Sequence, residues 1–138
     1  MIPFVACMVL VANAYHLPPR VLPSIQAVEG GNVGVVHRNT DGSEDLGVMQ
    51  VNTLWLRPLA QLSHLTEADV RGRLLNQPCF NIAAAGLILK SYLRETRGDL
   101  LLAIGDYHSH TPLLNQAYQT QVIHSATMMF VHREQGRP

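Results

Sequence analysis

The sequence contains little charge, few aromatic residues and only two cysteines. Charged residues make up 14% of the 138 residues and aromatic residues 6%. The ten basic and ten acidic residues balance, and no basic cluster stands out, so the chain lacks the electrostatic signature of a nucleic-acid-binding protein. No apolar run reaches the roughly 18 residues that a membrane-spanning helix requires. We therefore expect neither nucleic acid nor a membrane span.

Hydrophobic residues, at 47% of the chain, are sufficient for one core, and we expect a single domain over residues 1–138. Residues 2–14 are apolar and end in Ala12-Asn13-Ala14, which resembles the cleavage site of a leader peptide, but the first basic residue is Arg20. Helical spacing favours a mature first helix instead, with the true leader absent from this chain. Its expected apolar face comprises Phe4, Val5, Met8, Val9, Ala12 and Tyr15.

Glycine, proline and capping residues divide the chain into six or seven helices and one small β-hairpin. This pattern predicts an α+β fold that is mainly α. The expected helices cover residues 2–14, 18–29, 53–59, 66–76, 79–97, 99–107 and 113–134. Two short strands, 33–37 and 46–51, are expected on either side of the turn Asn39-Thr40-Asp41-Gly42-Ser43, which has Asp-Gly at its centre.

Two carboxylates bracket this hairpin region. Glu29 lies in the last turn of a helix that Gly30-Gly31 ends, and Asp45 follows the turn. A helix end and a hairpin can make two such groups face each other, as cleavage of a bond between two sugars requires. Burial beside apolar neighbours and the partial negative charge of the helix end would both keep Glu29 protonated and able to donate a proton.

Three short motifs carry a resemblance to a known family. They are Ala27-Val28-Glu29-Gly30-Gly31, Gly47-Val48-Met49-Gln50-Val51-Asn52 and Ala103-Ile104-Gly105-Asp106-Tyr107-His108. In this order the motifs resemble those of the soluble lytic transglycosylases (SLT) of the lysozyme superfamily, nearest to small members associated with secretion and conjugation. The resemblance covers about residues 7–118 and implies a lysozyme-like fold.

The resemblance implies an enzyme that acts on peptidoglycan glycan strands. Glu29 would be the general acid and base that cleaves the bond between N-acetylmuramic acid and N-acetylglucosamine and closes a 1,6-anhydro ring. The substrate contacts implied are Gly47, Met49, Gln50, Asn52, Tyr107 and His108. The chain departs from the family pattern where Gly30 replaces the usual Ser and where His108 replaces the usual Asn.

Structural roles compete for several of these residues. Met49 could fill a gap in the core, Asn52 could cap the next helix, and Trp55 is expected to pack rather than to stack on a sugar.

A second resemblance gives an alternative chemistry. The run from Asn39 to Asn52 is similar to the active-site hairpin of animal c-type lysozymes, in which the position of Asp45 holds the second catalytic carboxylate. The chain could thus be a retaining muramidase that uses Glu29 and Asp45. A third alternative is a peptidoglycan-binding assembly factor with weak or lost catalysis. The departures from the family pattern at Gly30 and His108 favour this alternative.

The two cysteines are compatible either with free thiols or with one disulfide in an oxidising compartment. Small members of the family tie the first helix to a segment like Pro78-Cys79-Phe80-Asn81-Ile82, so the resemblance implies a Cys7–Cys79 bond and a periplasmic or secreted protein. It also implies a monomer that could serve a secretion, pilus or conjugation apparatus. The seven histidines match no zinc motif, and we expect no metal or cofactor.

Overall fold

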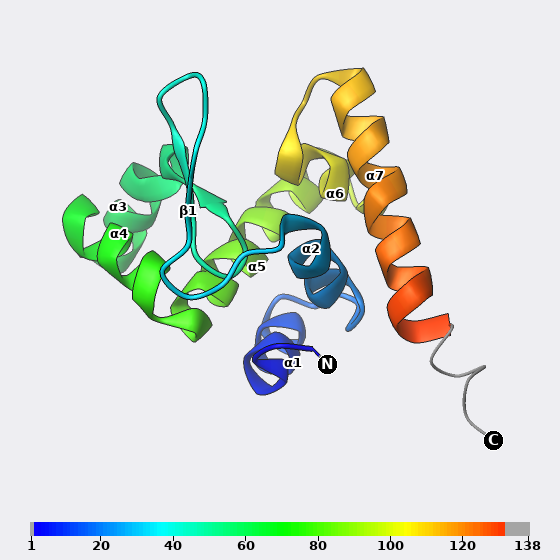
Figure 1. Ribbon diagram of the computed structural model, residues 1–138, viewed down its shortest axis with the longest axis horizontal. Coiled ribbons are helices and arrows are strands. Elements are labelled where there is room, and N and C mark those ends of the chain that lie inside the picture. Colours follow the sequence, from blue (N-terminus) through cyan, green and yellow to red (C-terminus); the bar gives the residue numbers. More distant parts are fainter. Residues whose placement is uncertain (1, 132–138) are drawn as a thin grey trace.

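The computed structural model describes residues 2–131, and in this part of the chain seven α-helices accompany a small three-stranded sheet (Figure 1). The α-helices are α1 (Val5–Ala14), α2 (Val21–Glu29), α3 (Leu56–Ser63), α4 (Glu67–Asn76), α5 (Pro78–Glu95), α6 (Leu100–His108) and α7 (Pro112–Ala126). The antiparallel strands, in sheet order, are β1 (Val36–Arg38), β2 (Glu44–Leu46) and β3 (Val51–Asn52). A short 3-10 helix, η1 (Thr53–Trp55), precedes α3, and a π-helical segment, η2 (Thr127–Val131), follows α7. The expected α+β, mainly α, lysozyme-like architecture is confirmed.

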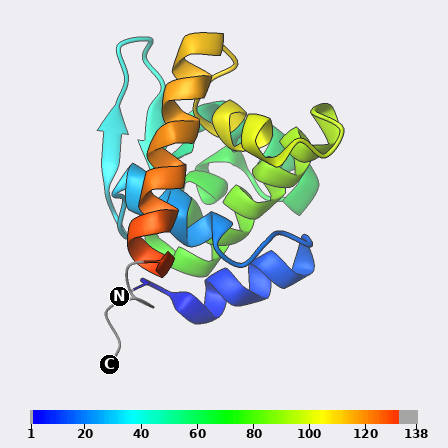
Figure 2. The ribbon, with the colours of Figure 1, turned by 90° about the vertical axis from the view of Figure 1, so that its right-hand side faces the viewer.

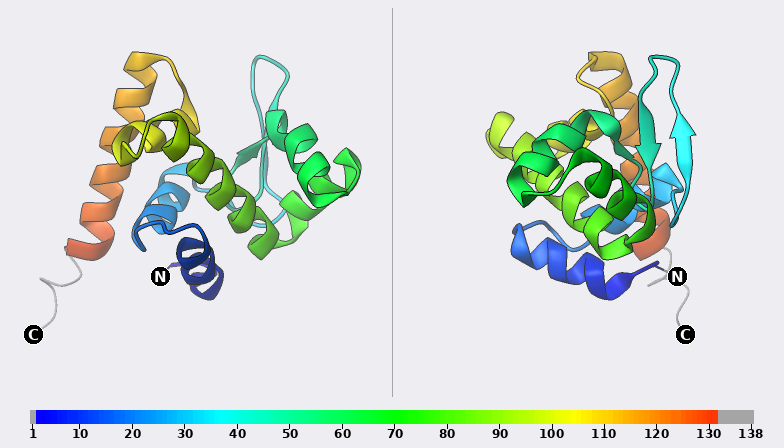
Figure 3. Two further views of the ribbon diagram at one scale, coloured as in Figure 1. Left: turned by 180° about the vertical axis from the view of Figure 1, so that it is seen from behind. Right: turned by 90° about the vertical axis from the view of Figure 1, so that its left-hand side faces the viewer.

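Helix α5 is the element around which the others pack. It contacts α1, α2, α4 and α6, and the view from behind shows it crossing the middle of the molecule (Figure 3). Its buried face combines large side chains such as Ile82 and Leu89 with small residues. Gly86 is one of these small residues. A Cβ at this position would collide with Val11 of α1. The missing side chain therefore allows α1 to lie closely against α5.

The cleft-forming elements stand on two sides of α5. The sheet, α3 and α4 lie on one side, while α6 and α7 lie on the other (Figures 1 and 2). Helix α2 contacts α7 and α5, so its C-terminal end reaches the space between the two sides. The fold thus brings the end of α2, the hairpin and α6 together.

The strand predicted over residues 46–51 is wrong, because the chain turns at residues 47–50 and forms two separate strands. Gly47 and Gln50 both adopt the left-handed backbone conformation, with φ of 72° and 53°. The Gln50 backbone N–H donates to the Gly47 carbonyl at 3.2 Å. The first strand is also displaced from 33–37 to 36–38, because Gly34 bends the chain with a φ of 79°.

The predicted apolar face of the first helix is only partly correct. Met8 and Ala12 are buried as expected, but Val5 and Val9 are 52% and 49% exposed, and Val11 is buried instead. The close contact with α5 at Gly86 selects this face, because it brings Val11 against the α5 backbone.

Several predicted helix ends agree with the structure and others differ, since α1 begins at Val5 rather than at residue 2 and α3 spans Leu56–Ser63 rather than 53–59. The side chains of Thr66 and Asp99 cap α4 and α6 as expected. The pair Pro18-Pro19 precedes α2, which begins at Val21. Thr111 provides no side-chain cap for α7, and its backbone N–H donates to Ser109 Oγ instead. The expected end of the last helix, at Glu134, lies outside the described residues.

A disulfide joins Cys7 of α1 to Cys79 in the first turn of α5, with the two Cα atoms 5.4 Å apart. The bond that the family resemblance implied is therefore confirmed. It closes a ring with a sequence separation of 72 residues. Among the described residues, no helix has the length and apolar character needed to cross a membrane.

Replacing both Cys7 and Cys79 by alanine should lower the free energy of unfolding. In the chain-entropy treatment, a ring of this size stabilises the folded state by about 4 kcal/mol, because it restricts the denatured chain. Urea unfolding followed by circular dichroism measures the change. Dithiothreitol should reduce the stability of the wild type and leave that of the double variant unchanged. Equal urea midpoints for the oxidised and the reduced wild type would contradict the expectation.

Candidate active site

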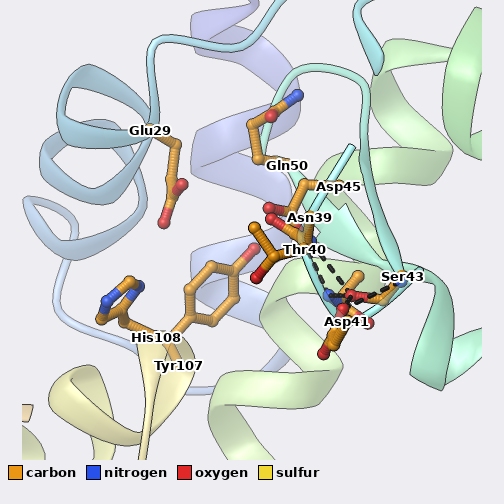
Figure 4. A pocket seen from close by; sticks show the side chains of 10 residues that line it. Glu29, Asn39, Thr40, Asp41, Ser43, Asp45, Gln50, Tyr107 and His108 are labelled. Atoms are coloured by element: carbon orange, nitrogen blue, oxygen red, sulfur yellow. Dashed lines mark hydrogen bonds between the residues drawn. The ribbon is translucent and has the colours of Figure 1, made fainter. Parts of the chain in front are cut away.

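A polar cleft of about 320 Å³ lies between the end of α2, the hairpin and the end of α6 (Figure 4). Six of the eight residues predicted for the site line it, and Gly47 and Met49 do not. The lining residues are Glu29, Asn39, Thr40, Asp41, Ser43, Asp45, Gln50, Asn52, Tyr107 and His108. Every one of them carries a hydrogen-bonding group, so the cleft suits a ligand rich in hydroxyl and amide groups.

Glu29 reaches the cleft because α2 stops at this residue. Gly30 takes the left-handed conformation that commonly ends a helix, with a φ of 64°, and its N–H donates to the Gln26 carbonyl at 2.8 Å. Gly31 then passes so close to the turn at residues 47–50 that a Cβ would collide with the backbone of Gly47 and Val48. The two glycines thus place the end of α2 against the hairpin.

The environment of Glu29 raises the pKa of its carboxyl to about 7. Burial is the main cause, because it penalises the charged form, and the nearby carboxylate of Asp45 adds to the increase. A hydrogen bond from the Tyr118 hydroxyl to Oε1, at 2.8 Å, acts in the opposite direction and is outweighed. Near neutral pH the group can therefore both donate and accept a proton, as a general acid–base catalyst must.

Asp45 lies on β2, and Asn52 on β3 holds its side chain. The Asn52 amide Nδ2 donates to Asp45 Oδ1 at 3.0 Å and to Ser43 Oγ at 3.1 Å. The other end of the same amide, Oδ1, accepts the Leu54 N–H at 2.9 Å. Asn52 therefore caps the following turn and also lines the cleft, so the two roles weighed for it are compatible.

The floor of the cleft rests on the backbone of Met49. The Tyr107 hydroxyl donates to the Met49 carbonyl at 2.8 Å, and the Met49 N–H donates to Asn81 Oδ1 at 2.8 Å. The side chain of Met49 is fully buried, and Gly47 packs against Asn81 and the Leu74 carbonyl. Gly47 and Met49 thus lie beneath the cleft, where they shape it through their backbone.

Gln50 is held in an unusual conformation at the edge of the cleft. A left-handed backbone at a non-glycine residue costs about 1–3 kcal/mol and is often found at functional sites. The Gln50 side-chain amide Nε2 donates to the Gly47 carbonyl at 3.0 Å, which helps to hold the turn. The side-chain oxygen Oε1 of Gln50 takes part in none of the hydrogen bonds found among the described residues, so it is available to a ligand.

Tyr118 on α7 is the functional side chain that sequence reasoning missed. Its ring is buried and stacks on the ring of His108, with centroids 5.0 Å apart and an angle of 11° between the planes. One tyrosine thus contacts two cleft residues, because its hydroxyl also binds Glu29. A buried tyrosine hydroxyl needs a hydrogen-bond partner, which is a reason to look for one. The sequence does not identify Glu29 as that partner, because 89 residues separate the two.

The tip of the hairpin contributes four polar residues that the sequence identified only as a turn. Asp41 Oδ1 accepts hydrogen bonds from the Ser43 N–H at 2.9 Å and from the Ser43 hydroxyl at 2.6 Å. Asn39 Nδ2 donates to Ser43 Oγ at 3.0 Å. These bonds order the tip before any ligand arrives. Trp55, by contrast, is not among the lining residues and packs edge-on against Tyr92, with centroids 5.9 Å apart.

Most of the chain matches a known protein family. The family described as the transglycosylase SLT domain matches residues 7–124. Protein IpgF of Shigella flexneri is 29% identical over 98 residues, which cover 70% of this chain and 60% of IpgF. Invasion protein IagB of Salmonella typhimurium is 27% identical over 106 residues, or 76% of this chain and 62% of IagB. The chain thus spans less than two thirds of the length of these curated relatives.

Replacing Tyr118 by phenylalanine should raise the pKa of Glu29 further above 7. The variant removes the hydrogen bond that favours the carboxylate and leaves the burial of the ring intact. A hydrogen bond to a charged group contributes about 1.5–3 kcal/mol, so the pKa should rise by about one to two pH units. Carbon NMR of the Glu29 carboxyl across a pH titration measures it. Tyr15→Phe, at a tyrosine that does not line the cleft, is the control, and an unchanged or lower pKa in the Tyr118 variant would contradict the expectation.

Proposed function

The chain belongs to the transglycosylase SLT family, and we propose that it is a lytic transglycosylase. Its substrate is the β-1,4 bond between N-acetylmuramic acid and N-acetylglucosamine in peptidoglycan. The observation that carries the proposal is the carboxyl of Glu29, which lines a polar cleft and has a pKa raised to about 7. A proton donor with a pKa near the working pH is what glycosidic cleavage needs.

In the proposed reaction, the protonated carboxyl of Glu29 donates its proton to the oxygen that joins the two sugars. The bond between this oxygen and C1 of the muramic acid breaks, and the N-acetyl oxygen of the same sugar shares the positive charge that develops. The Glu29 carboxylate then takes the proton of the C6 hydroxyl, whose oxygen attacks C1 and closes the 1,6-anhydro ring. Glu29 ends protonated, and the reaction consumes no water.

Two neighbours of Glu29 support this role. Tyr118 holds Oε1, which leaves Oε2 for proton transfer. Asp45 carries a carboxylate that raises the pKa of Glu29 and would also stabilise a cationic transition state. In the proposed complex the side chains of Gln50, Asn52, Tyr107 and His108 bind the glycan. In this arrangement Gly47 and Met49 act through the backbone at the cleft floor.

A second candidate function, retaining hydrolysis as in a muramidase, is favoured by one specific observation. Asp45 lines the same cleft as Glu29, and the Asn52 amide holds its carboxylate. In that reaction Asp45 would attack C1 or shield the charge on it, and water would complete the cleavage. The two functions share Glu29 as the acid and differ in the group that completes the reaction.

We also propose a periplasmic or secreted location and a local role in opening the cell wall. The disulfide between Cys7 and Cys79 supports an oxidising compartment. The similarity to an invasion protein supports service to a secretion, pilus or conjugation apparatus. In this proposal the chain acts as one monomeric domain and needs no cofactor for the reaction.

Replacing Glu29 by glutamine should lower the rate of peptidoglycan cleavage by about 100-fold or more, because an amide cannot donate the proton. Release of soluble fragments from purified peptidoglycan measures the rate. The activity of the wild type should fall as the pH rises through about 7, since Glu29 must start protonated. Glu67→Gln, on the exposed first turn of α4, is the matched control. Equal activity of the Glu29 variant and the wild type would end the assignment of the acid, and inactivity of both would favour a binding factor.

Mass spectrometry of the fragments should reveal 1,6-anhydro ends, which lack one water relative to hydrolytic ends. The variant Asp45→Asn should lower the rate by no more than about tenfold, because the substrate itself supplies the attacking hydroxyl. Reducing ends in the wild type, together with a loss of about 100-fold or more in this variant, would instead establish the muramidase reaction.

A further inference from the structure

A second group of ligand-type side chains lies outside the cleft, where α5 ends and the chain turns from α6 into α7. Glu95 is the last residue of α5, Asp106 belongs to α6, and His110 lies in the turn. Among the described residues, one ligand atom from each of these three lies within 4.8 Å of the other two. His110 Nε2 is 2.9 Å from Glu95 Oε1 and 3.8 Å from Asp106 Oδ2.

The carboxylate of Asp106 is the unusual member of this group, because it is only 6% exposed. Its Oδ1 accepts a hydrogen bond from Asn115 Nδ2 at 2.9 Å. Its Oδ2 faces His110 at a distance too long for a hydrogen bond and takes part in none of those found among the described residues. No buried side-chain oxygen among the described residues lacks a hydrogen bond, so Oδ2 is reached by solvent on the side of His110 and is free to accept a ligand there.

Supporting contacts hold two of the three side chains in place. Besides binding Asp106, the Asn115 amide Nδ2 donates to the Ser109 carbonyl at 3.1 Å. Gly105 permits this approach, since a Cβ there would collide with Asn115. The His110 ring packs edge-on against Tyr92, with centroids 5.2 Å apart. A carboxylate held by a hydrogen bond in this way is typical of metal ligands.

We propose that Glu95, Asp106 and His110 bind one divalent cation of the zinc type. One imidazole nitrogen and two carboxylate oxygens form a ligand set that zinc accepts, at distances of about 2.0–2.2 Å. In a tetrahedral site such ligands lie about 3.4 Å apart, so the exposed side chains of Glu95 and His110 need only small adjustments. Two carboxylates and a neutral imidazole carry a charge of −2, which the cation neutralises. Water completes the coordination.

The cation has a structural consequence for the cleft. It connects the end of α5 to α6 and to the turn that precedes α7. His108, which lines the cleft and stacks on Tyr118, ends α6 two residues before His110. A bound cation therefore fixes the segment that carries His108. No linear motif reveals the site, because its ligands come from three separate elements.

Calorimetric titration of the intact, EDTA-treated protein with zinc tests the proposal. The wild type should bind one zinc ion per chain. Glu95→Gln and His110→Gln should each weaken the binding by tenfold or more, because each removes one ligand and preserves the size of the side chain. His124→Gln, at an exposed histidine on α7, is the matched control and should bind as the wild type does. Circular dichroism verifies that every variant is folded.

The same samples give two further readouts that do not depend on catalysis. Zinc should shift the imidazole nitrogen resonances of His110 in the wild-type NMR spectrum. It should also raise the melting temperature of the wild type and of the His124 variant, but not that of the other two. Absence of saturable binding, or binding that the Glu95 and His110 substitutions leave unchanged, would overturn the proposal. The group would then be a cluster of side-chain contacts that holds no cation.

Discussion

The cleft depends on the buried side-chain amide of Asn81. Its Nδ2 donates to the carbonyls of Leu46 and Leu74 at 2.8 and 2.9 Å, and its Oδ1 accepts the Met49 N–H. One side chain on α5 thus satisfies the backbone of the turn at residues 47–50 and of the end of α4. Because a buried group left without its partner costs about 1–3 kcal/mol, this turn has one stable conformation. The Met49 carbonyl, which receives the Tyr107 hydroxyl, is fixed as a result.

The pKa of Glu29 is raised because the effect of burial exceeds the opposing effect of a hydrogen bond. One hydrogen bond from Tyr118 favours the carboxylate, yet the loss of water around the group and the charge of Asp45 together favour the acid. The position of the group follows from the chain, since Gly30 ends α2 in a left-handed conformation with a φ of 64°. A serine at that position, usual in the family, would be strained in the same backbone conformation, which gives a physical reason for glycine in this chain.

Local signals were sufficient to predict much of the fold. Glycine and capping residues predicted the helix ends, and the Asp-Gly turn predicted the hairpin. Three of the misses depend on distant partners. The strand over 46–51 breaks because Asn81, 32 residues after Met49, binds the turn. The face of α1 depends on Gly86 of α5. The contact of Glu29 with Tyr118 joins α2 to α7, and no local pattern encodes such a pair.

The disulfide places only some of the cleft residues within a covalent ring. The ring from Cys7 to Cys79 contains Glu29 and the hairpin, whereas Tyr118 lies beyond it on a helix that only noncovalent contacts hold in place. Mild heating that detached only α6 and α7 would let water reach the acid, whose pKa would then fall toward that of an ordinary glutamate. The group would be ionised at neutral pH and could no longer give up a proton. The strength of one acid would therefore report whether two helices are docked.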